Sequence, residues 1–105
     1  MEVALYTTRH KIINADGEVI TTGIFDNLPF SMDFYLMEQH AATFLTANKE
    51  KEVLHLYVTG FTPALSSFLI AYNRLMHYER PSKLILYHYD RDSGSYLSQP
   101  WFCRE

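Results

Sequence analysis

Two short clusters in the sequence combine residue types that hold phosphate. Thr7, Thr8, Arg9 and His10 follow one β-prone run directly. A guanidinium group binds two phosphate oxygens at once, and an imidazole exchanges a proton near neutral pH. Arg9 and His10 are therefore the candidate catalytic residues, Arg9 for charge on a reacting phosphate and His10 for proton transfer. Thr7 and Thr8 are candidate ligand-binding hydroxyls beside them. The alternative is an ordinary strand end with a surface arginine.

The second cluster is the segment VTGFTPA, residues 58–64. Gly60 can adopt backbone angles that let the chain approach a ligand closely. Thr62 is predicted to cap a following helix whose first residue is Pro63, and helix N-termini bind phosphate oxygens. Four candidate ligand-binding residues lie here: Thr59, Gly60, Phe61 and Thr62. The alternative is a simple strand-to-helix turn, since the spacing of a nucleotide-binding phosphate loop is missing.

A third polar cluster follows the run KLILYHY, residues 83–89. Asp90 to Gly94 has the composition of a turn, and within it Arg91 is the candidate ligand-binding residue. Alternation along a strand puts Tyr87 and Tyr89 on one face and His88 on the other.

No metal site or nucleophilic triad is visible in the pattern. His40, His55 and His77 lie in predicted regular elements without ligand spacing, which indicates packing or surface roles. The single cysteine, Cys103, has no identifiable base and no partner for a disulfide. We expect no cofactor.

Strands and helices alternate along the sequence. The predicted strands are Glu2–Thr8, Val53–Val58, Lys83–Tyr89 and Ser95–Phe102, with a hairpin at 11–24 that prolongs the first strand past the sheet. The predicted helices run from about Met32, capped by Ser31, to Ala47 and from Thr62 to about His77. This order predicts an α/β fold, a small Rossmann-like three-layer sandwich with a mostly parallel sheet and β-hairpin additions. The apolar run Val53–Val58 is predicted at the sheet centre with helices on both faces.

The carboxyl ends of parallel strands meet at one edge of a sheet, where ligands bind near the point at which strand order reverses. The three polar clusters all follow predicted parallel strands. We therefore expect them to share one edge, and the question is whether they share one pocket.

Length and charge restrict the classes of function. The 105 residues predict a single domain over 1–105. A net charge of -3 argues against binding to duplex nucleic acid, although a few cations in one pocket are enough to bind a small anion. Apolar runs are too short to span a bilayer and no basic leader is present, so we expect no membrane association and a cytoplasmic location.

Two runs carry a resemblance to a known family: Thr59-Gly60-Phe61-Thr62-Pro63-Ala64, followed by a helix, and then Leu84 to Asp90. With them, residues 53–97 resemble the end of a CARF domain, the Rossmann-like domain of type III CRISPR systems. The resemblance implies antiviral defence and a homodimer, or a higher homo-oligomer, that binds a cyclic oligoadenylate across its two-fold axis. Small family members sequester this ligand or cleave it without metal as ring nucleases. Thr59, Gly60 and Thr62 match one ligand-binding motif of the family and Thr7, Thr8 and Arg9 another. Phe61 departs from the family pattern, and a lysine expected after it is missing.

Two other classes remain open. The aromatic residues Tyr96, Trp101 and Phe102 and the Met- and Tyr-rich first helix favour a protein-interaction module with no small-molecule site. A metal-dependent hydrolase has less support, because carboxylates and histidines do not cluster in the sequence.

Overall fold

The computed structural model describes residues 1–8, 10–28 and 32–103 and confirms the α/β class. The elements are β1 (Glu2–Ala4), α1 (Phe34–Ala47), β2 (Val53–Tyr57), α2 (Thr62–Arg74), a short 3-10 helix η1 (His77–Glu79), β3 (Lys83–Asp90) and β4 (Ser95–Cys103). Within these described ranges, no helix is both long enough and apolar enough to cross a membrane.

The strands form one mostly parallel sheet in the order β1-β2-β3-β4. β1, β2 and β3 are parallel, and β4 returns antiparallel to β3 through the turn at 91–94. The prediction that β2 is an inner strand is confirmed. Pro100 lies in β4 at the sheet edge, beside a register irregularity, where its missing N–H is tolerated.

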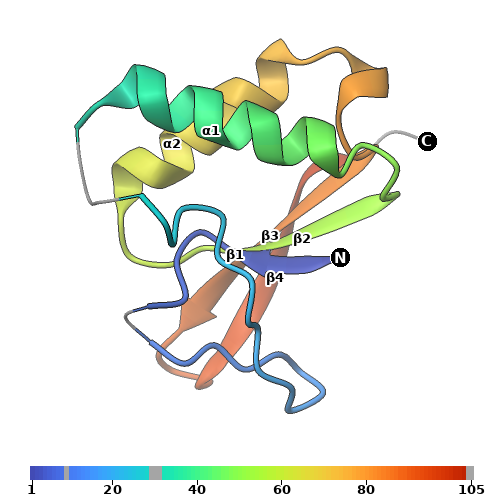
Figure 1. The fold of residues 1–105 in the computed structure, drawn as a ribbon. Helices are drawn as coiled ribbons and strands as arrows, with labels where there is room; N and C mark the ends of the chain where they lie inside the picture. The colour runs from blue at the N-terminus through green and yellow to red at the C-terminus, as the bar shows by residue number, and fades with distance from the viewer. Residues whose placement is uncertain (9, 29–31, 104–105) are drawn as a thin grey trace.

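Both helices lie on one face of the sheet (Figure 1) and pack against each other. The expectation that β2 is covered by helices on both faces is therefore wrong. Each helix connects one parallel strand to the next, and both connections add the new strand on the same side of the previous one. Because such connections are right-handed, both helices then lie on the same face of the sheet. Strand order consequently never reverses, so the rule of a reversal point does not locate a site here.

Alternate residues of the strands fill the core beneath the helices. Val3, Leu54, Leu56, Leu84 and Leu86 are almost completely buried on this face. The helices α1 and α2 pack onto these strand residues with their own buried side chains: Met37, Ala41, Leu45, Ala64, Phe68 and Tyr72.

The third layer is the irregular segment 11–24, which packs under the opposite face of the sheet. Its buried residues Ile12 and Ile20 contact Ala4 and Tyr57. The predicted hairpin is present as one antiparallel bridge, Ile13 to Val19, around a turn in which Gly17 has a φ of 82°. The chain then runs parallel to the outer edge of β1, pairing Gly23 with Ala4. It does not prolong the first strand.

The first strand ends at Ala4 rather than Thr8 because side chains replace its backbone partners. The Leu5 N–H still donates to the carbonyl oxygen of Tyr57 at 3.2 Å. The next two amides donate instead to side chains: Tyr6 to the Thr59 hydroxyl at 3.0 Å and Thr7 to an Asp26 carboxylate oxygen at 2.8 Å. The polar residues after β1 are therefore fixed by tertiary contacts.

The helix caps differ from the prediction. Asp33 caps α1 by accepting the Leu36 N–H at 3.0 Å, whereas Ser31 lies outside the described residues. Phe61, not Thr62, occupies the N-cap position of α2, without a side-chain hydrogen bond. Its backbone is extended after the turn at Gly60, and its carbonyl oxygen accepts the Ala64 N–H at 3.0 Å. α2 ends at Arg74, where the backbone of Leu75 becomes extended, rather than at His77.

Candidate functional site

A pocket of about 460 Å³ lies at the carboxyl edge of the parallel strands. We call it the edge pocket. Its lining residues come from the segments after β1, β2 and β3, from the end of β3 and from the start of β4: His10, Lys11, Val58, Thr59, Gly60, Tyr89, Arg91 and Tyr96. Four residues that the sequence singled out, His10, Thr59, Gly60 and Arg91, thus share one cavity. Their role toward a ligand stays a prediction.

The edge pocket carries positive charge on a chain whose net charge is negative. Lys11 and Arg91 approach from the segments after β1 and β3, with His10 beside them, and all three are exposed. No described residue that lines the pocket is acidic. Such a concentration of cations attracts a small anion. Lys11 was missed by the sequence reasoning, although it directly follows the cluster 7–10.

Gly60 makes the wall of the edge pocket that belongs to the turn after β2. Its φ of 46° lies in the region that side chains with a Cβ rarely adopt. The sequence expectation that this glycine permits a sharp turn agrees with that angle.

The two threonine hydroxyls nearest the pocket hold segments of the fold together. The Thr59 hydroxyl accepts the Tyr6 N–H and donates to the Tyr6 carbonyl oxygen, both at 3.0 Å. The Thr7 hydroxyl donates to the carboxylate of Asp26. These bonds fix the chain between β1 and His10, and they already occupy hydroxyls that the sequence assigned to a ligand.

Among the remaining candidate residues, those that the structure describes do not line the edge pocket. Arg9, the predicted phosphate ligand, lies outside the described residues. Thr8 is exposed, and Thr62 is the first residue of α2. Phe61 packs toward the core under the helices, edge-on to the ring of Tyr6 with centroids 6.3 Å apart.

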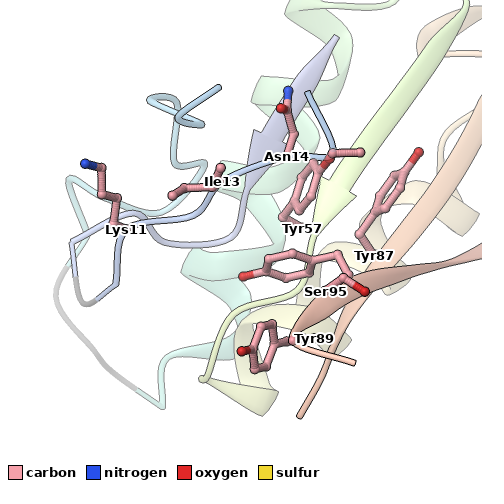
Figure 2. A pocket seen from close by; sticks show the side chains of 10 residues that line it. Lys11, Ile13, Asn14, Tyr57, Tyr87, Tyr89 and Ser95 are labelled. Atoms are coloured by element: carbon pink, nitrogen blue, oxygen red, sulfur yellow. The ribbon is translucent and has the colours of Figure 1, made fainter. Parts of the chain in front are cut away.

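A second pocket, of about 530 Å³, adjoins the first on the face of the sheet opposite the helices. We call it the tyrosine pocket. Segment 11–15 lies along one side, and the rings of Tyr57, Tyr87 and Tyr89 lie along the other (Figure 2). Tyr96, Gly94 and Ser95 complete the lining. The sequence reasoning had placed Tyr87 and Tyr89 on one face, as observed, but it did not foresee a pocket there.

The inner tyrosines of this pocket form a packed, hydrogen-bonded array. The rings of Tyr57 and Tyr87 stack with centroids 4.6 Å apart and planes inclined at 12°. The Tyr57 hydroxyl donates to Glu2 at 3.1 Å, and the Tyr87 hydroxyl lies 2.7 Å from Nδ1 of His55. Burial, followed by the nearby charge of Glu2, raises the pKa of both tyrosines. Burial likewise lowers the pKa of His55. The array is therefore uncharged at neutral pH.

This array predicts a loss of stability in alkaline solution. A folded-state pKa above the unfolded value means that the stabilisation is complete below about pH 10 and is lost as pH rises through the folded pKa. We expect the free energy of unfolding, measured in urea, to fall as pH rises above about 10. Tyr57→Phe should flatten this decline. An equal decline in Tyr57→Phe would contradict the assignment to Tyr57.

The histidines within the sheet and helices have structural partners. His55 bonds Tyr87, and Nε2 of His40 lies 2.7 Å from the carbonyl oxygen of Ile24. His88 lies on the helical face and bonds Gln99 at 2.7 Å. Throughout the described ranges, no three His, Cys, Asp or Glu residues group closely enough to hold a metal ion.

Comparisons with protein-family models, with curated proteins and with solved structures find no match to this chain. The chemistry of the two pockets therefore rests on their own geometry.

Proposed function

We propose that the protein binds a phosphate-bearing nucleotide at the edge pocket. The observation that carries this proposal is the convergence of Lys11, Arg91 and His10, from two separate segments, on a pocket whose described lining holds no carboxylate. Gly60 lets the backbone form part of the same wall. Arginine and lysine bind phosphate oxygens through charge-assisted hydrogen bonds, and aromatic side chains beside them suit a nucleoside.

The particular ligand that we propose is a cyclic oligoadenylate or a related second messenger, held by a homodimer. Small-molecule pockets span roughly 300–1,000 Å³, and the edge pocket, at about 460 Å³, is at the lower end of that range. It suits one nucleotide unit rather than a whole ring. A ring of several units would need a second copy of the pocket, which is the arrangement that the resemblance to CARF domains implies.

Binding without turnover is the simpler form of this proposal, and slow cleavage is its extension. A ribose 2′-hydroxyl would lose its proton to water and attack the adjacent phosphorus, and the bond from phosphorus to the leaving 5′-oxygen would break. His10 would supply a proton to that oxygen, while Arg91 and Lys11 would bind the charged phosphate oxygens. This reaction leaves a 2′,3′-cyclic phosphate and a free 5′-hydroxyl, which separate from the intact ring by chromatography.

The test is a titration with cyclic tri-, tetra- and hexa-adenylate, followed by calorimetry and by chromatography of the nucleotide. We expect Arg91→Gln to weaken binding about 10-fold or more, since a hydrogen bond to a charged group contributes about 1.5–3 kcal/mol. Lys49→Gln is the matched control: it removes the same charge from an exposed residue after α1 and should change affinity little.

The outcomes distinguish sequestration of the ligand from its cleavage. Binding without new products means sequestration, and products that disappear in His10→Ala mean cleavage. If none of the three rings binds, a cyclic oligoadenylate is refuted as the ligand. If a ring binds but Arg91→Gln and Lys49→Gln lower its affinity equally, binding at the edge pocket is refuted.

A protein-interaction module is the second candidate, because several large apolar side chains are exposed. Phe34 and Tyr35 lie in the first turn of α1, and Leu97 and Trp101 lie on β4. Exposed aromatic residues favour interfaces. This function predicts that replacing Trp101 abolishes association with a partner, while nucleotide titrations of the unmodified protein give no signal.

A further inference from the structure

The edge pocket and the tyrosine pocket are adjacent and have three lining residues in common, Lys11, Tyr89 and Tyr96. One of these is a cation and two are aromatic. A nucleotide has the same division, with a charged phosphate at one end and a planar ring at the other. A single nucleotide unit can therefore extend from one pocket into the other.

The inner hydroxyls of the tyrosine pocket are bonded to protein groups. Those of Tyr57 and Tyr87 pair with Glu2 and His55. The Ser95 hydroxyl lies 2.9 Å from that of Ser93. The inner wall therefore offers ring surface rather than a pattern of donors and acceptors that could read the edge of a base.

The side chain of Asn14, on the opposite wall, is also engaged. Its Oδ1 accepts the N–H groups of Asp16 and Glu18, each at 2.9 Å, and its Nδ2 donates to Glu2 at 2.8 Å. An amide held in this way keeps the turn of segment 11–24 in place. It is poorly disposed to select one base over another.

Tyr89 is the exposed ring at the boundary of the two pockets. The residue is 57% exposed, and its ring contacts that of Tyr96 edge-on with centroids 5.4 Å apart and an interplanar angle of 66°. A contact of this kind covers at most one face of the Tyr89 ring, and the high exposure of the residue leaves room for a further planar group against it. Stacking of a base on an aromatic side chain contributes about 1–3 kcal/mol and tolerates any base.

We propose that the tyrosine pocket binds the purine ring of a nucleotide by stacking on Tyr89, without reading the ring's edge, while the phosphate lies in the edge pocket. This inference rests on the proposed function, because the edge pocket must hold the phosphate. It goes beyond the proposed function by assigning the base to the face of the sheet opposite the helices. It also predicts that adenine and guanine bind with similar affinity.

The experiment compares AMP, GMP, CMP and ribose 5-phosphate by calorimetry on the whole chain. Ribose 5-phosphate carries the phosphate and sugar without a base. We expect AMP and GMP to bind about 5- to 100-fold more tightly than ribose 5-phosphate. The affinity of CMP should lie between that of the two purine nucleotides and that of ribose 5-phosphate. AMP and GMP should differ by less than about 3-fold, because stacking alone separates them weakly.

Two matched variants test whether the preference for a nucleotide over ribose 5-phosphate comes from the Tyr89 ring. Tyr89→Ala should lower the affinity for AMP about 5- to 100-fold, to the level of ribose 5-phosphate, and leave ribose 5-phosphate unchanged. Tyr35→Ala, at a 74% exposed tyrosine of α1 that lines neither pocket, should change nothing. Arg91→Gln should weaken AMP and ribose 5-phosphate alike.

Each outcome decides between the two proposals. Equal affinities for AMP and ribose 5-phosphate, with both weakened by Arg91→Gln, would overturn the inference and leave the edge pocket intact as a phosphate site. A preference for AMP over GMP greater than about 10-fold would overturn stacking without edge readout. Failure of all four probes to bind would overturn both proposals.

Discussion

Replacing Gly23 with alanine should destabilise the protein by about 3 kcal/mol, from overpacking and a weakened charge-assisted hydrogen bond. A Cβ atom at Gly23 would overlap the carboxylate of Asp26. That carboxylate cannot simply move, because it accepts both the N–H and the hydroxyl of Thr7. The backbone of Gly23 does not have a positive φ, so the cost arises from the contact rather than from strain.

A double-mutant cycle measured by urea unfolding tests whether the overlap with Asp26 causes the loss of stability. Asp26→Ala alone should cost about 2 kcal/mol, since it leaves the partly buried Thr7 N–H without its acceptor. In the Asp26→Ala background the added Cβ has room, and Gly23→Ala should cost less than about 0.5 kcal/mol more. Additive losses in the double variant would show that the overlap with Asp26 is not the cause.

The same contact matters for the proposed site. Thr7 lies three residues before His10, and its bonds to Asp26 hold the chain that enters the edge pocket. If that pocket binds nucleotide, Gly23→Ala should also weaken AMP binding, whereas a mutation of similar cost elsewhere in the core should not. Phe68→Ala, under the helices, is a suitable comparison.

Replacing Arg80 with alanine should destabilise the protein by about 3 kcal/mol, the sum expected for a buried charge-assisted hydrogen bond and a cation–π contact. Arg80 is only 9% exposed and donates to the carbonyl oxygen of Tyr72 near the end of α2. Its guanidinium carbon lies 4.3 Å from the centre of the Tyr72 ring. A cation in this position also interacts favourably with the helix C-terminus.

Arg74→Ala provides the matched control, because Arg74 ends the same helix. Its side chain is 75% exposed and forms a 2.7 Å ion pair with Glu38 on α1. Surface ion pairs contribute about 0–1 kcal/mol, so we expect a small loss. Thermal or urea unfolding that ranked Arg74→Ala as the more costly change would contradict this account of Arg80.

The order of elements and the parallel sheet were predictable from local pattern. The apolar run 53–58 contains β2, and the strand at 95–102 agrees with β4 to within one residue. The start of α2 was harder. Thr62-Pro63 has the local signal of a cap, but the Phe61 ring packs toward the core and shifts the N-cap to Phe61. Tertiary packing outweighed a cap worth about 1 kcal/mol.

One part of the candidate site was likewise predictable from the sequence and another part was not. Strand order alone predicted that His10, Gly60 and Arg91 would meet at one edge, and they line one pocket. The tyrosine pocket could not be predicted, because it depends on segment 11–24 folding back under the sheet. The long-range bond from Asn14 to Glu2 helps to hold this segment, and no local pattern encodes it.

The two edges of the sheet differ in a way that limits how copies of the protein can assemble. The outer edge of β1 is sealed by residues 22–25, whereas the described part of the chain leaves the outer edge of β4 open. The sheet can therefore grow in one direction only. Two copies joined about a two-fold axis through β4 would pair these strands antiparallel. Such a dimer would carry its edge pockets at opposite ends of a continuous sheet, too far apart to hold one ring. A dimer that shares a cyclic ligand must instead meet at the carboxyl edge, without pairing the outer edges of the two β4 strands.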